Sequence, residues 1–463
     1  MFIKYKFLQK LLFYNIILIK YFKINKKYMK KIFIYLTFLF LLASKSKSLL
    51  RIPFYRNLTL PENDINLIDY LRDYRIYIQL DAGKSKLHST FNFNNYRFII
   101  NGQTGNYEPS ENTATLIKDI AFYGLNYQSE HFDGFYIKDT FYLYNSTKNI
   151  PIRLDNFPFI VSVVSNLKNL DSFGDSIIGL KMCDNSYENK EKETSFIYLL
   201  KENKIVENYI FTFNYKTKDE GEFIIGNYPH EFDNNYRKEN LRKIKGHFFN
   251  DEVIWEFSFD SIKVGNEEIG IKNNIDFSVR PGIMAPKIYK EIIKKNFFGK
   301  LRKCFYVNTD GHDYTNEFTY YYCEKEAFNE TQFQNFPKLI FKHNIFGEFE
   351  LNYKDLFKEI NGKFYFLVVF NNLPDSRWTL GDVFLRKYQF VFDNELKTIG
   401  FYVQEGYKPT WNLVIILCLL IILMSLILIR KIYCEPNRAI SERFEYDKYT
   451  KYQPPEQQKI DIN

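Results

Sequence analysis

Short segments rich in aromatic and β-branched residues fill the middle of this chain and limit what it can fold into. Clusters of Asn, Asp, Gly and Lys separate them, which is the pattern of strands joined by turns. Helical patterns are brief, the best being Ser195–Asn203 and Pro286–Lys295. The sequence therefore predicts a large all-β protein with a few short helices. The clearest predicted strands are Ile76–Leu80, Tyr96–Ile100, Phe135–Leu143, Phe159–Val164, Tyr209–Tyr215, Glu222–Ile225, Val253–Phe259, Phe305–Val307, Phe364–Phe370 and Gln389–Phe392.

Two apolar segments frame this β-rich body. The first, Ile32–Ser44, follows Met29-Lys30-Lys31 and has the basic start, short apolar run and small-residue exit of a secretory signal peptide. The simplest account is that translation begins at Met29, and a signal anchor is the alternative. The second, residues 411–429, is long enough to span a bilayer and is followed by Arg430-Lys431, which predicts a cytoplasmic tail over 430–463. We therefore expect a single-pass type I membrane protein of the secretory pathway, with its body on the lumenal or extracellular side.

The predicted domains follow from these segments. Residues 1–48 form an N-terminal extension with the signal peptide, and 49–408 form the body. Cys434, just inside the predicted span, fits either a palmitoylation site or a plain free thiol.

The net charge of +8 does not indicate a nucleic-acid partner. Residues 1–44 contain nine lysines and no acidic residue, so removing them would leave the rest of the chain near neutral. The six histidines show no metal-ligand spacing, and the chain has no Gly-x-Ser-x-Gly, His-Glu-x-x-His or phosphate-binding glycine loop. We expect a monomer with no cofactor and no metal.

The cysteines and glycosylation sequons agree with the secretory route. Cys304 and Cys323 flank one loop, and an oxidising compartment would join them in a local disulfide. Cys183 has no obvious lumenal partner. The three sequons predict possible glycans on Asn57, Asn145 and Asn329.

A series of segments in fixed order carries the functional prediction. In chain order they are Gln79-Leu80-Asp81-Ala82-Gly83, Phe122-Tyr123-Gly124, Phe132–Phe141, Asp175–Leu180, Ser195–Leu200, Ile210–Phe213, Gly221–Gly226, Trp378–Tyr388, Val391–Asp393 and Ile399–Phe401. Together these segments resemble the pepsin-like aspartic peptidases, over about Ile52 to Tyr402, and Trp378–Phe401 is the most specific part. The resemblance implies two similar β-barrel-like lobes, at about 49–230 and 231–408, with a substrate cleft between them.

The resemblance also implies the site residues. In that family each lobe contributes one aspartate, and the two share a proton while they activate a water molecule. Asp81 matches the first aspartate and Gly83 the glycine of its turn. Tyr123 and Gly124 match the flap that closes over substrate.

Two neighbours of Asp81 depart from the family pattern. Ala82 replaces the usual threonine or serine, and Lys84 replaces a serine that normally hydrogen-bonds the aspartate. A lysine there would favour the charged form of Asp81, and a solvated loop lysine is the equal alternative.

The second motif departs further. Counting back from Pro286 puts Phe277 at the aspartate position. If one residue is inserted, Asp276 takes that role, with Phe277 and Ser278 in the places of the hydroxyl residue and the glycine. A ring and a Cβ in such a turn should redirect the chain.

Two functions follow. The first is a membrane-anchored aspartic endopeptidase with Asp81 and Asp276 as its dyad. The second is a catalytically impaired homologue that binds a peptide or protein partner. The pepsin-like fold is compatible with either function, because a fold does not by itself determine activity.

Overall fold

The computed structural model describes most of the body of the chain. The described residues are 49–56, 75–93, 95–102, 105–123, 131–146, 151–165, 174–181, 195–249, 252–269, 274–310, 317–327, 330–371 and 377–403. The chain divides into two compact units, Met1–Gln404 and Glu405–Asn463, and all described residues belong to the first. The predicted signal peptide, membrane span and cytoplasmic tail lie outside the described residues. No helix within the described ranges is long and apolar enough to cross a bilayer.

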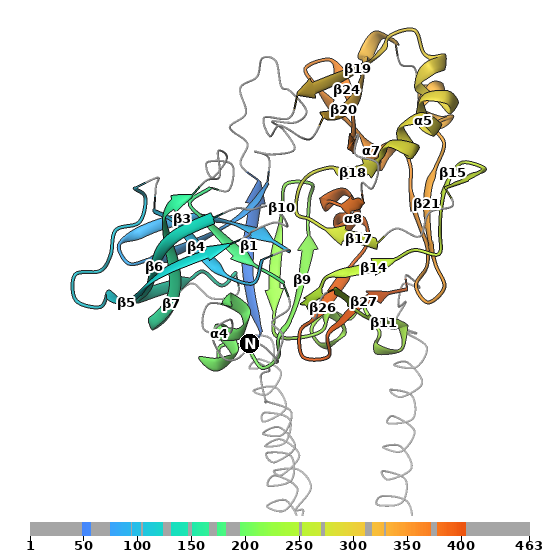
Figure 1. Cartoon of the computed structure of the whole chain (residues 1–463). Helices are drawn as coiled ribbons and strands as arrows, with labels where there is room; N and C mark the ends of the chain where they lie inside the picture. Colours follow the sequence, from blue (N-terminus) through green and yellow to red (C-terminus); the bar gives the residue numbers. More distant parts are fainter. Residues whose placement is uncertain are drawn as a thin grey trace, which may run out of the picture. The chain divides into compact units, whose positions relative to one another are not determined.

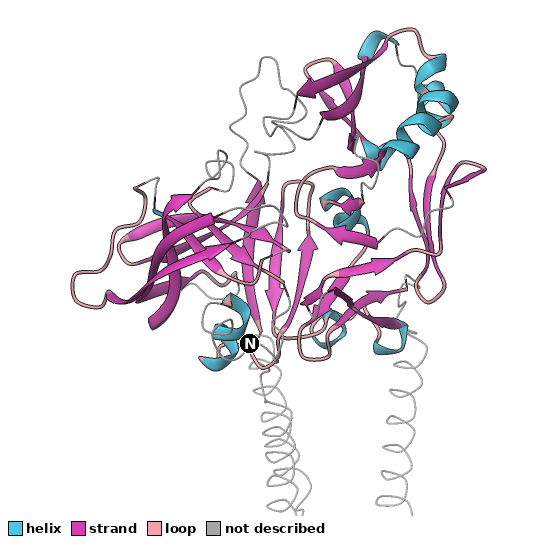
Figure 2. Ribbon diagram, in the orientation of Figure 1, coloured by secondary structure: helices cyan, strands magenta, loops and turns pink. Residues whose placement is uncertain are grey.

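The N-terminal half of the body is almost entirely strand (Figures 1 and 2). One α-helix, α4 (Phe196–Glu202), is described in it. Its strands are β1 (Leu50–Arg56), β2 (Ile76–Ala82), β3 (Ser85–Asn92), β4 (Phe98–Asn101), β5 (Thr115–Tyr123), β6 (His131–Leu143), β7 (Ile152–Ser165), β8 (Ser176–Gly179), β9 (Ile210–Tyr215) and β10 (Glu220–Ile225).

The C-terminal half mixes strands with short helices (Figure 2). Its helices are η4 (Pro229–Glu231), η5 (Lys238–Asn240), α5 (Lys287–Asn296), η6 (Phe298–Lys300), η7 (Lys325–Ala327), α6 (Glu330–Gln334), α7 (Tyr353–Leu356) and α8 (Asp382–Lys387). Its strands are β11 (Leu241–Lys245), β12 (His247–Phe249), β13 (Glu252–Ile254), β14 (Glu256–Ser258), β15 (Ser261–Val264), β16 (Glu267–Ile269), β17 (Asn274–Phe277), β18 (Ile283–Pro286), β19 (Cys304–Asp310), β20 (Glu317–Glu324), β21 (Leu339–His343), β22 (Gly347–Leu351), β23 (Phe357–Ile360), β24 (Lys363–Asn371), β25 (Trp378–Leu380), β26 (Phe390–Asp393) and β27 (Thr398–Tyr402).

Strands from both halves of the body share one sheet. Among the described residues it has the order β11-β27-β26-β9-β10-β1-β2-β3-β8-β4-β7-β6-β5. Its central strands β1, β10 and β9 stand side by side in Figure 1. On one side of them β2 leads into the N-terminal strands, and on the other β26 and β27 return from the end of the body. The C-terminal half adds a second sheet, β14-β17-β25-β18-β24-β20-β19, and a four-stranded one, β16-β15-β21-β22.

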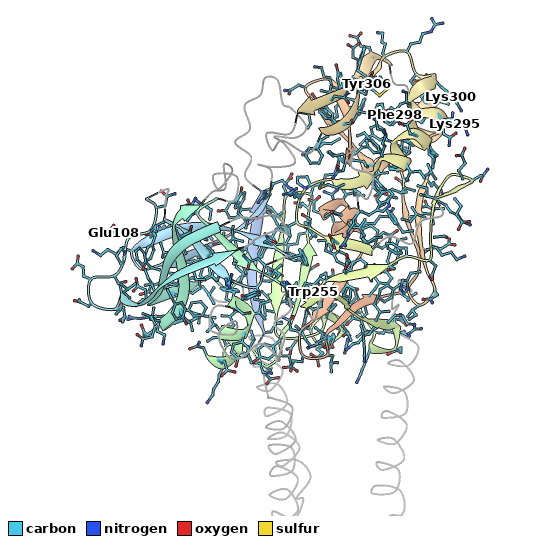
Figure 3. The ribbon with its side chains drawn as sticks, viewed as in Figure 1. Glu108, Trp255, Lys295, Phe298, Lys300 and Tyr306 are labelled. Carbon is cyan, nitrogen blue, oxygen red and sulfur yellow. A yellow bond between two sulfur atoms is a disulfide. The ribbon has the colours of Figure 1, made fainter. Side chains whose placement is uncertain are left out.

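Aromatic rings hold the two halves against each other. Phe93, from the N-terminal half, contacts Phe277 and Phe392, with ring centroids 6.1 and 5.1 Å away. Trp255, labelled in Figure 3, donates its indole N–H to the carbonyl of Leu180. All of these aromatic side chains are buried, so they belong to one hydrophobic core that crosses the junction.

The predicted strands and helices are confirmed. Each predicted strand coincides with one or two observed ones, Val253–Phe259 being divided into β13 and β14. The predicted helix Ser195–Asn203 is α4. The helix predicted at Pro286 begins one residue later, because Pro286 ends β18 and serves as the N-cap of α5.

Candidate active site

Asp81 lies at the end of β2 because strand alternation separates it from its neighbours. Leu80 and Ala82 are fully buried, so the side chain between them faces the other side of the sheet, where it is half-buried. β2 is fixed on both edges near this point, since Asp81 pairs with Lys86 of β3 and with Tyr142 of β6. The sequence thus places this carboxylate on a rigid element.

Tyr144 is the hydrogen-bond partner of Asp81. Its hydroxyl donates to Oδ2 of Asp81 over 2.5 Å, and this bond, with burial, raises the pKa of Tyr144 to about 12. Tyr144 therefore remains a neutral donor throughout the acid and neutral range. Oδ1 of Asp81 is buried and accepts no hydrogen bond from the described residues. Tyr144 was not predicted, although it follows β6, whose sequence carries part of the family pattern.

The turn after Asp81 requires glycine. Gly83 has φ +60°, and its N–H donates to the carbonyl of Thr140 over 2.9 Å. A Cβ at this position would lie 2.4 Å from the carbonyl oxygen of Glu108 and 2.7 Å from Oδ2 of Asp139. Both the conformation and the close approach exclude a larger residue.

The side chain of Asp139 holds this turn in place. Its fully buried carboxylate accepts hydrogen bonds from the Thr113 hydroxyl at 2.7 Å, the Ser110 N–H at 2.9 Å and the Tyr107 hydroxyl at 3.0 Å. Burial alone would raise its pKa, but the hydrogen bonds from Ser110, Thr113 and the Thr140 N–H outweigh burial and hold the pKa of Asp139 below its usual value. Asp139 is thus a structural carboxylate that connects β6 to the loop beside Gly83.

Lys84 behaves as a loop lysine. It is exposed, and its ammonium is 2.6 Å from a carboxylate oxygen of Glu111 and 3.5 Å from one of Glu108. The hydrogen bond to Glu111 is the main reason that its pKa is raised. Because Lys84 is paired with these two glutamates, the geometry favours the solvated-loop interpretation.

Asp276 lies on β17 and interacts with Glu256 of the neighbouring strand. Asp276 and Glu256 face each other across the β14–β17 pair, so their side chains lie on the same face of the sheet. Glu256 is fully buried and accepts a 2.7 Å bond from Arg377. Burial and the neighbouring carboxyl of Glu256 raise the pKa of Asp276 to about 7, against the opposing effect of Arg377. Glu256 and Arg377 were not predicted.

Phe277 is a core residue. It is 2 % exposed, and besides Phe93 it contacts Phe257, Phe390 and Phe392, with ring centroids between 5.1 and 5.6 Å away. The ring at the position counted for the second aspartate is therefore part of the packing between the two halves.

The turn after Phe277 is held against Gly381. The Ser278 N–H donates to the carbonyl of Leu380, and the Asp382 N–H donates to that of Arg280. A Cβ on Gly381 would lie 1.8 Å from the carbonyl oxygen of Gly282. The second turn is thus fixed against the end of β25 and the start of α8, and the redirection expected from Phe277 and Ser278 stays a prediction.

These features match one family. The family model for eukaryotic aspartyl proteases matches residues 77–403, which is most of the chain. The chain belongs to the eukaryotic aspartyl protease family. The pepsin-like resemblance inferred from the sequence is confirmed.

A solved structure shows the same fold. The chain of the crystal structure of basic 7S globulin from soybean aligns with this aspartyl protease family member at a TM-score of 0.54 and 12% identity. The alignment covers 77% of this chain and 95% of that one. No curated protein matches the sequence. At this identity the likeness shows the fold alone.

The remaining predicted site residues have mixed outcomes in this aspartyl protease fold. Tyr123 ends β5 and pairs with His131 of β6, but its side chain and Gly124 lie outside what is described. The disulfide between Cys304 and Cys323 is confirmed, as a bridge between paired positions of β19 and β20. Asn57, Asn329 and Cys183 lie outside the described residues. Asn145 is only 5 % exposed, so a glycan there would displace its present surroundings.

Because the pKa of Asp276 is raised, we expect an unusual pH dependence of the free energy of unfolding. A carboxyl whose pKa is raised on folding contributes stability at acid pH that is lost as pH rises from its unfolded value near 4 to about 7. In Asp276→Asn this loss should be smaller, by about 1–3 kcal/mol in the free energy of unfolding across that window. Urea unfolding of the full-length protein at several pH values measures it. Asp155→Asn, at an exposed carboxylate, is the control, and an Asp276→Asn profile parallel to wild type would contradict the expectation.

Proposed function

We propose that this chain is a membrane-anchored member of the aspartyl protease family that binds a peptide or protein partner and hydrolyses peptide bonds poorly. One observation carries the proposal: Asp276 faces the buried Glu256 across the β14–β17 pair, whereas Asp81 accepts a hydrogen bond from Tyr144. Phe277, at the position obtained by counting back from Pro286, packs in the core.

The chemistry explains why this arrangement impairs catalysis. In aspartic proteases two adjacent carboxyls share one proton, so that one activates the water molecule and the other supports the developing oxyanion. Here Asp276 faces Glu256, which is fully buried and bonded to Arg377. In the proposal Asp276 interacts with Glu256 and does not serve Asp81 as the second carboxyl of the family reaction.

The secretory location is part of the proposal. The Cys304–Cys323 disulfide supports it, because such bonds persist in oxidising compartments. The apolar segments at 32–44 and 411–429 and the sequons at Asn57 and Asn329 support a lumenal or extracellular body with one C-terminal span.

Endopeptidase activity is the second candidate. It is favoured by Asp81, which has the strand end, the glycine turn and the half-buried position that the family mechanism requires. For this function the carboxyl of Asp276 would have to pair with that of Asp81 instead of Glu256.

The two candidates separate in one experiment. Purified full-length protein is incubated with denatured proteins from about pH 3 to 6, where a shared-proton pair operates, and binding of a statine-containing peptide is followed by thermal shift. We expect the statine peptide to raise the melting temperature and no cleavage above background.

The variant Asp81→Asn shows whether any cleavage comes from this protein. Cleavage that the statine peptide inhibits and that Asp81→Asn abolishes, with the melting temperature retained, would establish the endopeptidase. Cleavage that persists in Asp81→Asn would identify a contaminating protease and leave the proposal standing.

A further inference from the structure

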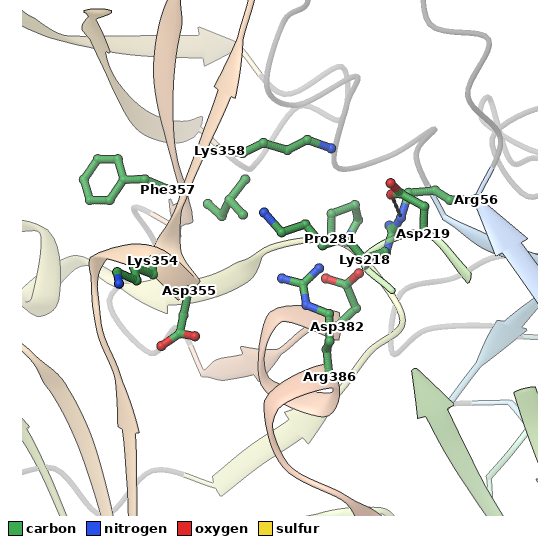
Figure 4. Close-up of a pocket in the computed structure, with 11 residues that line it drawn as sticks. Arg56, Lys218, Asp219, Pro281, Lys354, Asp355, Phe357, Lys358, Asp382 and Arg386 are labelled. Atoms are coloured by element: carbon green, nitrogen blue, oxygen red, sulfur yellow. Dashed lines mark hydrogen bonds and ion pairs between the residues drawn. The ribbon is translucent and has the colours of Figure 1, made fainter. Parts of the chain in front are cut away.

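His343, the last residue of β21, is buried without charge, unlike Arg56 and Asp382 of Figure 4, which are buried as an ion pair. Its side chain leaves the residue 7 % exposed, and Nδ1 of the ring lies 3.1 Å from the backbone nitrogens of both Ile345 and Phe346. A backbone N–H can only donate, so Nδ1 is the acceptor of both bonds and the proton of the neutral ring is on Nε2.

These hydrogen bonds close the turn between β21 and β22. His343 pairs with Gly347 across this turn, which consists of residues 344–346. The N–H of Asn344 donates to a carboxylate oxygen of Asp260 over 2.5 Å, and the next two N–H groups donate to Nδ1. The imidazole therefore takes the place of a backbone carbonyl as the acceptor for this turn.

Phe346 connects the turn to the hydrophobic core. Its ring is buried, and its centroid lies 4.7 Å from that of His343 and 5.6 Å from that of Phe257. It also contacts Phe390 and Phe401, with centroids 6.4 and 6.0 Å away. These two residues belong to β26 and β27, which pair within the sheet shared by both halves of the body. A displacement of Phe346 would therefore alter the packing of that sheet.

The elements packed against His343 bring both signs of charge. Their charged groups are Asp260 before β15, Lys245 of β11, Glu256 of β14, Lys342 of β21 and Glu348 of β22. Lys342 and Glu348 are exposed and pair with each other. Burial lowers the pKa of His343 below its ordinary value of 6.5, and the negative charge of Asp260 opposes this effect. Because burial disfavours the charged ring, protonation favours a turn that has opened.

We propose that the turn at residues 344–346 is an acid-sensitive switch, in which a proton from solvent binds Nδ1 of His343 and displaces the N–H groups of Ile345 and Phe346. A protonated Nδ1 is a donor that faces two donors, so both hydrogen bonds are lost together. A cavity of about 500 Å³, lined by His343 and Ile345, gives the charged ring space to move toward water. The switch would loosen Phe346 in an acidic compartment whether or not the protein cleaves peptide bonds.

Amide hydrogen exchange of the full-length protein measures the opening of the turn. Between about pH 7.5 and pH 4.5, after correction for the intrinsic exchange rate, the peptide that covers the turn should lose about tenfold to a hundredfold in protection, because two backbone hydrogen bonds are lost. In His343→Asn, whose side-chain oxygen accepts hydrogen bonds and does not titrate, protection should be independent of pH. The turn between β23 and β24, at Asn361 and Gly362, contains no histidine and should show no such loss.

A second measurement needs no variant that alters the turn. Exchange of the Cε1 hydrogen of histidine, followed by mass spectrometry, titrates His343 directly, and the loss of amide protection should coincide with this titration below pH 6.5. In Asp260→Asn both should move together to lower pH, because a charge that favours the protonated ring is absent.

Three results would overturn the proposal. The first is a turn that keeps its protection through the whole range or after His343 has been protonated. The second is a turn that opens while His343 is still neutral. The third is a loss of protection that persists in His343→Asn and disappears in Asp260→Asn, because Asp260 would then be the titrating group.

Discussion

Phe277→Ala is expected to lower the free energy of unfolding by about 3–5 kcal/mol. The reason is that this ring fills the space between four other phenylalanines, one of which, Phe93, belongs to the opposite half of the body. Removing it leaves a cavity that the two β-rich halves cannot readily close. Chemical denaturation of the full-length protein, followed by tryptophan fluorescence, measures the change.

Phe305→Ala is the matched control, because Phe305 is 41 % exposed. It should change stability by less than about 1 kcal/mol. If Phe277→Ala were as mild as this control, Phe277 would not be a packing residue, and the position could accept an aspartate without reconstruction of the core. A large loss would show that a second catalytic aspartate cannot be restored here by a single substitution.

Arg56→Met should be similarly destabilising, by about 3–5 kcal/mol. Arg56 is 1 % exposed at its side chain and pairs with Asp382, which is equally buried and 326 positions away. Removing the guanidinium leaves Asp382 charged and buried without its partner, and this penalty exceeds the net value of the intact pair. Equilibrium unfolding at neutral pH measures the effect.

A double variant distinguishes the contribution of the ion pair to stability from that of the packing around Arg56. Arg56→Met combined with Asp382→Leu should recover much of the lost stability, because both charges are then absent. Arg153→Met removes an exposed pair with Asp155 and should cost less than about 0.5 kcal/mol. A double variant no more stable than Arg56→Met alone would mean that the arginine acts through its other contacts.

The strand pattern of the body was predictable because it is local. Leu80, Asp81 and Ala82 alternate between buried and half-buried positions, and the glycine that ends the strand follows directly. The partners of the site residues are not local. Glu256 meets Asp276 through the register of β14 and β17, and Arg377 reaches Glu256 from the residue that precedes β25. Nothing in the neighbourhood of Asp276 indicates either residue, so the sequence predicted the candidate aspartate and could not predict what holds it.

The partners of Lys84 could not be predicted from the sequence either. From the sequence, its position three residues after Asp81 left two interpretations equal. The structure distinguishes them through Glu108 and Glu111, which belong to a different loop and approach Lys84 only because that loop packs over the turn.

The shared sheet has a consequence for how the protein is made. β9 pairs with β26 through Phe211 and Phe392, whose rings are stacked, so one edge of β9 is covered by residues near the end of the body. A ribosome releases β9 long before β26, and in that interval a strand edge and the ring beside it have no cover. Completion of the body therefore depends on its final strands, and a chain that terminates before Phe390 would present a ready surface for aggregation.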